Sequence, residues 1–204
     1  MDWQHRIAAA LDEHLAVTKQ LADASSSILQ MAVELVETLR RQGKVVLFGN
    51  GGSASDAQHI AAEIQGIRER QSTNQGLLAL VLTDNTALFT AISNDVGYHE
   101  AFRRQVEAIV RGDDLVIGIS TSGNSQNVIE GILAAKKRGT RTVALLGESG
   151  KLAEVADIAV SVPSQTVPRI QEAHMLIGHI VCELAQRMTT GAYQTRFSSS
   201  ASQN

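Results

Sequence analysis

The sequence is poor in the features that mark secreted, membrane-spanning and nucleic-acid-binding proteins. It has one cysteine, Cys182, which excludes an intrachain disulfide and favours a reducing compartment. Aromatic residues make up only 3%, and no basic block occurs in a chain of formal charge −3, so we expect no nucleic-acid surface. No apolar run approaches the roughly 20 residues of a membrane span or resembles the apolar core of a signal peptide. We therefore expect a cytoplasmic protein that binds neither nucleic acid nor membrane.

Hydrophobic residues make up 44% of the 204 residues, enough for the core of one globular domain. Apolar residues at helical spacing predict two helices before residue 43, the first over about 2–22, with a weak break at 24–27. The first helix has apolar residues but little neighbouring core to cover them. We expect it to pack against another subunit, and docking on its own domain is the alternative.

Short apolar runs then alternate with helical stretches. The predicted strands are 45–48, 77–82, 114–119, 142–146 and 158–162. The predicted helices are 53–65, a short one within 83–94, 98–111, 126–138, a short one near 152–155, and 168–188. This alternation predicts an α/β fold with a doubly wound, parallel, five-stranded sheet and an added N-terminal helix. We expect one domain over residues 1–192 and a disordered, Ser/Gln-rich tail over 193–204.

The turn after the first strand, GNGGSA from Gly49, matches the dinucleotide fingerprint G-x-G-x-x-A. That site also needs an acidic residue roughly 20 positions later, at the end of the second strand. Here Asp84 lies more than 30 residues after Gly49, which disfavours a nicotinamide cofactor. A purely structural interpretation of Ser53 and Asp56 is a capping box that starts the helix. The turn on its own therefore remains an ambiguous anion site.

A second polar turn, STSGNS over residues 120–125, follows the third predicted strand. Its four hydroxyls and one amide are more than a surface turn needs. Hydroxyls and backbone N–H groups at a helix N-terminus bind a phosphate without Lys or Arg. Because both turns follow strands of one parallel sheet, we expect them to open into one crevice that binds a phosphorylated small molecule.

His59 and Glu63 lie one helical turn apart and share a helix face. Such a pair is often only structural, but it also suits metal binding or proton transfer. The last helix offers possible partners: Gln171, Glu172, His174 and His179. Gln171 and His179 are about 80° apart around the helix axis, and spacing alone does not choose among the four. The partnership with His59 and Glu63 can be made within one chain or across subunits.

Four separated stretches together resemble the sugar isomerase (SIS) domain and, more narrowly, the phosphoheptose isomerases: GNGGSASDAQHIAAE, AISNDVGY, DLVIGISTSGNS and RIQEAHMLIGHIVCEL. The resemblance runs from about Gly43 to Leu184. It implies a flavodoxin-like SIS fold, a homotetramer with active sites between subunits, and one zinc ion per subunit. The metal ligands that it implies are His59, Glu63, Gln171 and His179, with Glu63 and His179 as the acid/base residues. The substrate-binding residues that it implies are Asn50, Gly51, Gly52, Ser53, Asp95, Ser120, Thr121, Ser122, Ser125 and Gln171.

The resemblance implies an aldose–ketose isomerase that converts D-sedoheptulose 7-phosphate into D-glycero-D-manno-heptose 7-phosphate through an enediolate, for lipopolysaccharide core or other heptose biosynthesis. A carboxylate base, an imidazole proton shuttle and a zinc ion suit this chemistry. Residues 68–78 and Pro168 depart from the family pattern, which keeps an isomerase of another sugar phosphate open. A third possibility is a non-enzymatic tetrameric relative that binds the bacterial replication initiator; the presence of all four metal-binding positions favours the enzyme.

Overall fold

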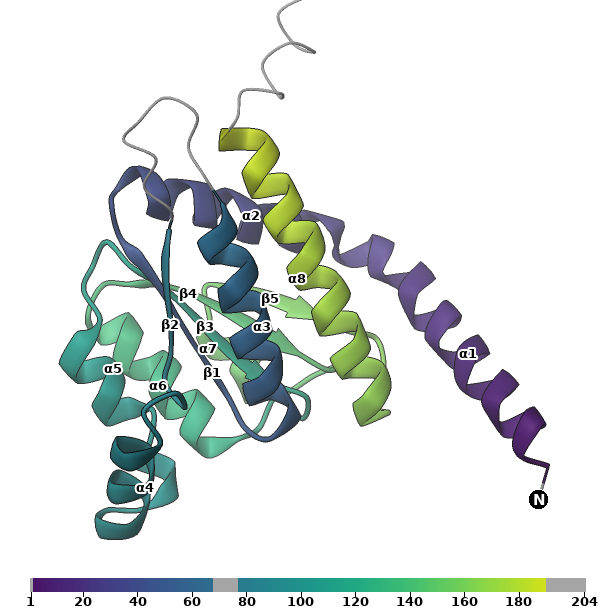
Figure 1. Ribbon diagram of the computed structural model, residues 1–204, viewed down its shortest axis with the longest axis horizontal. Helices are drawn as coiled ribbons and strands as arrows, with labels where there is room; N and C mark the ends of the chain where they lie inside the picture. Colours follow the sequence, from purple (N-terminus) through teal and green to yellow (C-terminus); the bar gives the residue numbers. More distant parts are fainter. Residues whose placement is uncertain (1, 68–76, 190–204) are drawn as a thin grey trace, which may run out of the picture.

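The computed structural model describes residues 2–67 and 77–189 and contains one five-stranded, all-parallel sheet (Figure 1). The strands are β1 Lys44–Gly49, β2 Leu78–Val81, β3 Leu115–Ser120, β4 Arg141–Leu146 and β5 Ile158–Ser161. Their order across the sheet is β2-β1-β3-β4-β5. The predicted fold class is thereby confirmed. Residues 68–76 and the tail predicted over 193–204 lie outside the described residues.

Both faces of the sheet are covered, as the all-apolar strand runs predict. In β1 the side chains of Val45, Val46, Leu47 and Phe48 are fully buried. Because successive side chains of a strand point to opposite faces, they belong to two separate cores. Val45 and Leu47 pack in one core and Val46 and Phe48 in the other.

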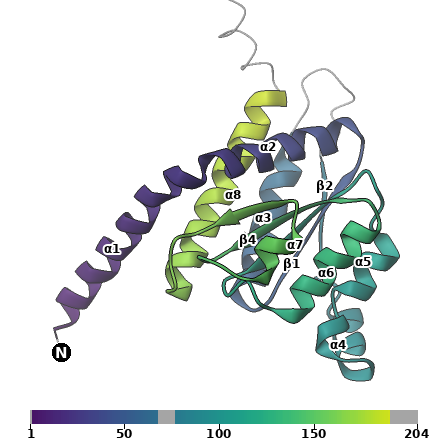
Figure 2. The same cartoon turned by 180° about the vertical axis from the view of Figure 1, so that it is seen from behind.

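Helices form the outer layers on both faces (Figures 1 and 2). The helices are α1 Trp3–Gln20, η1 Leu21–Ala24, α2 Ser25–Arg40, α3 Gly52–Gly66, α4 Thr86–Asp95, η2 Tyr98–Glu100, α5 Arg103–Ile109, α6 Gln126–Lys137, α7 Lys151–Val155 and α8 Val167–Thr189, where η marks a 3-10 helix. Helices α2, α3 and α8 cover one face, and α5, α6 and α7 cover the other. The sheet is therefore doubly wound.

The helix predicted over 98–111 is present in two pieces. The η2 helix covers Tyr98–Glu100, residues 101–102 form a turn whose backbone stays in the right-handed helical region, and α5 covers Arg103–Ile109. The turn buries Ala101 and Phe102 completely, and the Phe102 ring stacks on Phe48 with centroids 4.8 Å apart. Burial of this aromatic pair outweighs the helical spacing of the segment. The break predicted near 24–27 is real but begins earlier, since α1 ends at Gln20.

Helix α1 projects away from the domain (Figures 1 and 2) and buries none of its residues within the described structure. Its apolar side chains Trp3, Ile7, Leu11 and Leu15 recur every four residues and form one stripe that is 54–69% exposed. This α1 stripe is the uncovered apolar face that the sequence predicts. Within residues 2–67 and 77–189, no helix is both long enough and apolar enough to cross a bilayer.

Two glycines with positive φ allow a matched stability test. Gly139→Ala is expected to lower the free energy of unfolding by about 1–2 kcal/mol, the cost of a side chain in the left-handed region. Its φ is 73°, and no described atom lies within 4 Å of an added Cβ. Gly123→Ala is expected to cost about 1–3 kcal/mol more, for overpacking. There φ is 64°, and the added Cβ would lie 2.5 Å from the Ser149 carbonyl oxygen.

Urea unfolding followed by far-ultraviolet circular dichroism measures both losses. Equal losses in the free energy of unfolding would show that the backbone at Gly123 shifts to accommodate the added Cβ, and that this turn is not packed tightly against residues 149–150.

Candidate active site

The candidate site begins where the direction of winding of the sheet reverses. β1 and β3 are neighbours, yet α3 follows β1 on one face of the sheet and α6 follows β3 on the other. The two polar turns predicted from the sequence lie after these two strands, at the same edge of the sheet. A crevice opens at such a switch point in doubly wound folds.

The second turn gathers its hydroxyls. The Ser120 hydroxyl donates a hydrogen bond to Ser125 Oγ at 3.0 Å and lies 3.4 Å from Ser122 Oγ. Ser125 occupies the N-cap position of α6, but its side chain makes no capping bond within the described structure. Thr121 and Ser122 line a cavity of about 240 Å³. Three hydroxyls at a helix N-terminus, where the backbone N–H groups also point outward, suit a phosphate group.

The first turn also differs from an ordinary helix start. α3 begins at Gly52 with Gly51 at the N-cap position, so Ser53 lies inside the first turn and buried, and the capping-box interpretation is wrong. An added Cβ on Gly52 would lie 2.2 Å from Gln171 Nε2. The glycine therefore lets the Gln171 amide of α8 lie directly against this turn.

Asp56 is a buried carboxyl group on α3. Burial raises its pKa to about 6, while the nearby His59 lowers it. Its Oδ2 atom has no hydrogen-bond partner among the described residues. Nothing in the sequence pattern beyond the capping box singled out this residue.

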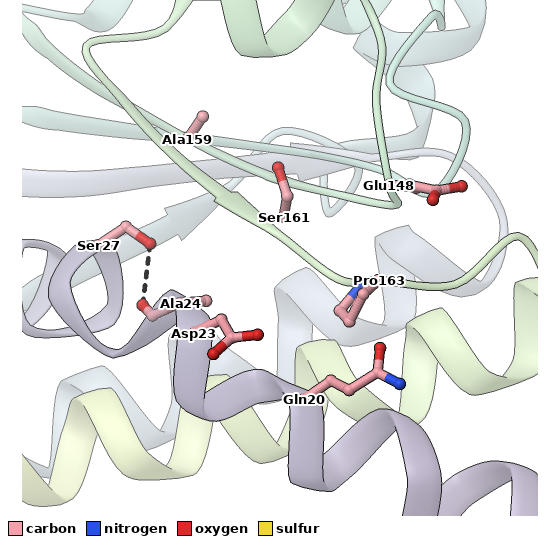
Figure 3. Close-up of a pocket in the computed structure, with 8 residues that line it drawn as sticks. All are labelled: Gln20, Asp23, Ala24, Ser27, Glu148, Ala159, Ser161 and Pro163. Atoms are coloured by element: carbon pink, nitrogen blue, oxygen red, sulfur yellow. Dashed lines mark hydrogen bonds between the residues drawn. The ribbon is translucent and has the colours of Figure 1, made fainter.

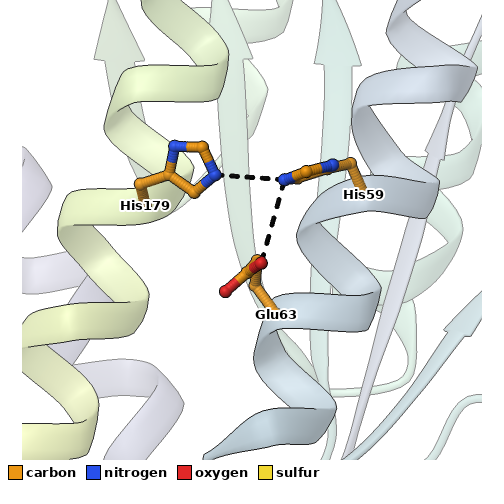
Figure 4. A group of neighbouring side chains, drawn as sticks. All are labelled: His59, Glu63 and His179. Atoms are coloured by element: carbon orange, nitrogen blue, oxygen red, sulfur yellow. Dashed lines mark hydrogen bonds and ion pairs between the residues drawn. The ribbon is translucent and has the colours of Figure 1, made fainter.

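Helices α3 and α8 bring the catalytic candidates together (Figure 4). His59 Nε2 and His179 Nε2 are 3.0 Å apart, and their rings meet edge to face with centroids at 5.2 Å. Glu63 Oε1 lies 3.9 Å from His59 Nε2. One ligand atom from each of the three residues lies within 4.8 Å of the others. All three side chains remain solvent-exposed, so a substrate has access to them.

The three side chains fit a divalent metal ion. Two imidazole nitrogens bound to one tetrahedral zinc ion at about 2.0–2.1 Å lie about 3.3 Å apart, close to the separation of the two histidines. Gln171 is not part of this group. It lies eight residues before His179, about 12 Å along the axis of α8 at 1.5 Å per residue. Within one chain, three of the four expected ligands converge.

The remaining candidates on α8 have structural surroundings. His174 is fully buried, and its Nε2 lies 3.2 Å from the Leu146 carbonyl oxygen. Burial lowers the pKa of His174 to about 4, so the ring is neutral near pH 7. Glu172 pairs with Arg169 and with His14 of α1. Of the two α8 histidines, only His179 meets His59.

Cys182 lies beside the three-residue group without joining it. With Glu63 and His179 it lines a cavity of about 310 Å³. Burial, with the nearby Glu63, raises the pKa of its thiol to about 12. Because a metal ligand must be the thiolate, Cys182 is a core residue here.

The substrate-binding candidates of the first turn extend to residues that the sequence analysis missed. Asn50 and Asn127 exchange two side-chain hydrogen bonds of 2.9 Å, and the Tyr98 hydroxyl donates to Asn50 Oδ1 at 2.7 Å. Asp95, the last residue of α4, is exposed and accepts a bond from the Asn94 side chain. The buried position of polar Asn127, at the start of an amphipathic helix, is the one signal that could have pointed to it.

A third cavity, of about 330 Å³, serves as a reference because it contains none of the predicted site residues (Figure 3). It lies between the η1–α2 junction, β5 and the loop after β4. Its lining residues are Gln20, Asp23, Ala24, Ser27, Glu148, Ala159, Ser161 and Pro163.

Comparison with known proteins agrees with this geometry. The family model described as the SIS domain matches residues 11–147. The phosphoheptose isomerase of Helicobacter pylori (strain P12) is 47% identical over 173 residues, covering 84% of this chain and 89% of that protein. The relative from Thermodesulfovibrio yellowstonii is 44% identical over 188 residues, 91% of this chain and 92% of that protein.

A solved structure of the phosphoheptose isomerase from Neisseria gonorrhoeae superimposes with a TM-score of 0.84 at 39% identity, covering 90% of this chain and 98% of that chain. The enzyme from Francisella tularensis gives a TM-score of 0.85 at 31% identity, covering 92% and 100%. The chain belongs to the phosphoheptose isomerase family of SIS-domain proteins.

The hydroxyl turn makes a specific prediction about anion binding. Inorganic phosphate is expected to raise the melting temperature of the wild type, because a ligand of the native state stabilises it. Ser122→Ala combined with Ser125→Ala is expected to abolish this rise. Thermal unfolding in phosphate and in chloride at equal ionic strength measures it.

Ser161→Ala is the control, since Ser161 lines the reference cavity of Figure 3. Loss of the phosphate effect in this variant, with the effect kept in the double variant, would place the anion elsewhere.

Proposed function

We propose that the protein is an isomerase that converts D-sedoheptulose 7-phosphate into D-glycero-D-manno-heptose 7-phosphate for heptose biosynthesis. The observation that carries the proposal is the convergence of His59, Glu63 and His179 beside a helix that starts at a polar, anion-suited turn. The names of the relatives from Helicobacter pylori and Neisseria gonorrhoeae support the substrate.

The reaction needs a proton taken from C1, a proton returned to C2, and a shift of the hydroxyl proton between the two oxygens. Glu63 is the proposed base, because it is the one carboxylate of the three-residue group and its side chain is exposed beside His59. His179 is the proposed proton shuttle, because one imidazole nitrogen can accept a proton while the other donates one.

The substrate phosphate is proposed to bind the hydroxyl turn, and the sugar chain to extend from there. The proposed phosphate- and sugar-binding residues are Asn50, Gly51, Gly52, Ser53, Asp95, Ser120, Thr121, Ser122, Ser125 and Gln171. His59 lies seven residues after Gly52, about 10 Å along α3. The proton-transfer steps are therefore proposed to take place farther along α3 than the sugar-binding first turn.

One zinc ion per subunit is the proposed cofactor, held by His59, Glu63 and His179. When bound, zinc would polarise the substrate carbonyl and stabilise the negative charge of the enediolate. Gln171 is the proposed fourth ligand, and the 12 Å estimated along α8 favours donation from a neighbouring subunit. Such a ligand would make the active site intersubunit.

A homotetramer is the proposed assembly. The α1 stripe of Trp3, Ile7, Leu11 and Leu15 supports it, because a contiguous exposed apolar face marks an interaction surface. Two contacts hold α1 against α8: Arg169 donates a hydrogen bond to the Ala10 carbonyl oxygen, and Glu172 pairs with His14. Assembly through α1 would thus be coupled to the first turns of α8.

Purified wild type loaded with zinc is expected to convert sedoheptulose 7-phosphate into an aldose phosphate, followed by proton NMR. Glu63→Gln is expected to abolish turnover because the amide cannot accept the C1 proton.

His59→Ala is expected to lose turnover and bound zinc together, with zinc measured by mass spectrometry after dialysis. Removal of zinc by a chelator is expected to stop the wild-type reaction, and added zinc to restore it.

His5→Gln is the control, because His5 lies on exposed α1 and outside the candidate site. It is expected to keep both zinc and activity. If the zinc-loaded wild type acts on no ketose phosphate but binds a bacterial replication initiator, the isomerase proposal is wrong and the non-enzymatic alternative holds. Turnover of a pentose 5-phosphate, without turnover of sedoheptulose 7-phosphate, would show that the proposed substrate is wrong.

The assembly has its own test. Multi-angle light scattering of the wild type is expected to give four times the chain mass of 21.8 kDa. Leu11→Asp combined with Leu15→Asp is expected to give a smaller species, since two charges would be buried at the interface. The matched control is Ala16→Asp, at an exposed α1 position outside the stripe. An unchanged mass for the double variant would remove α1 from the interface.

A further inference from the structure

Asn50 is the point where three separate segments of the candidate site meet. It follows β1, Asn127 lies in the first turn of α6, and Tyr98 opens η2 after α4. Asn127 is 3% exposed, whereas Tyr98 is 51% exposed. The partners of Asn50 are 77 and 48 residues away in the sequence. The contacts are therefore tertiary and tie both polar turns to the α4 side of the site.

The hydrogen bonds leave the Asn50 amide with one unused hydrogen-bond donor. A side-chain amide has two N–H donors and one oxygen with two lone pairs. Asn50 Oδ1 accepts from Asn127 Nδ2 and from the Tyr98 hydroxyl, which uses both lone pairs. Asn50 Nδ2 donates one hydrogen to Asn127 Oδ1. Its second N–H has no further partner among the described residues.

The reciprocal pair couples the orientations of the two amides. Turning over the Asn50 amide alone would set its NH2 group against the Asn127 NH2 group, and the pair would be lost. A buried amide that loses its partners is costly, and Asn127 is nearly completely buried. Because the Tyr98 hydroxyl donates to Oδ1, Asn50 keeps one free N–H, and this N–H selects an acceptor oxygen.

We propose that Asn127 and Tyr98 are positioning residues that present the Asn50 N–H to an acceptor oxygen of the sugar phosphate. The inference rests on the proposed function, since it assigns this oxygen to the substrate of the same site. Neither residue needs to touch the substrate. Tyr98 acts from an exposed segment, and Asn127 acts from the buried start of the helix whose N-cap is Ser125.

Tyr98→Phe is the sharpest test, because it removes only the hydroxyl that donates to Asn50. The ring and its edge-to-face contact with Phe89 remain, so folding should be unaffected. With sedoheptulose 7-phosphate as substrate, KM is expected to rise about threefold to tenfold, the effect of one hydrogen bond. The value of kcat is expected to stay within about twofold, since a positioned binding group acts on the ground state and the transition state alike.

A double-mutant cycle shows whether Tyr98 acts through Asn50. In an Asn50→Ala background, adding Tyr98→Phe is expected to raise KM no further. Thr90→Ala is the matched control, because it removes a hydroxyl from exposed α4 whose bonds go only to the backbone of its own helix among the described residues. It is expected to leave KM unchanged.

Two results would overturn the inference. One is an unchanged KM in Tyr98→Phe. The other is a rise in KM that persists undiminished in the Asn50→Ala background, which would mean that Tyr98 acts directly or through the fold. If the wild type binds sedoheptulose 7-phosphate without turning it over, the proposed isomerisation fails. The cycle then applies to the calorimetric Kd, with the same expected factors and the same overturning results.

Discussion

The site depends on how closely α8 approaches α3. Gly178 faces Ile60 at their crossing, and a Cβ at Gly178 would lie 2.7 Å from Ile60 Cγ1. The neighbouring residues in the two helices are His179 and His59, whose Nε2 atoms are 3.0 Å apart. Helix axes normally pack 8–10 Å apart according to the side chains at the contact. Here a missing side chain allows the approach, so the convergence of His59 and His179 follows from packing in the core.

A second constraint is the reversal of winding between β1 and β3. It places two helix N-termini at one edge of the sheet, and both carry polar turns. Helix N-termini attract anions through their unpaired N–H groups and dipoles. This explains why the described turns provide a phosphate-suited site with hydroxyls and glycines and without a lysine or arginine. His59 and Glu63, the proposed reacting side chains of α3, lie farther along the same helix.

Sequence periodicity predicted the sheet because parallel strands covered on both faces are uninterrupted apolar runs. It also predicted the two turns and placed His59 and Glu63 on one helix face. It did not predict the interruption at residues 101–102, where Phe102 packs against Phe48, and it was wrong at Ser53, which lies inside a helix that glycines start. The choice of His179 over His174 came from family resemblance, because burial and helix approach are tertiary properties that spacing does not encode.

The same reasoning explains why the sequence did not predict the contacts of Asn50. Its partners lie on segments that only the fold brings together, and a reciprocal amide pair leaves no periodic pattern. Helix α4, none of whose residues are buried in the described structure, packs against the η2 segment that follows it. Tyr98 opens that segment and bonds to Asn50. The exposed α4 side and the buried sheet edge therefore meet at one amide, which makes the geometry of the first turn depend on both.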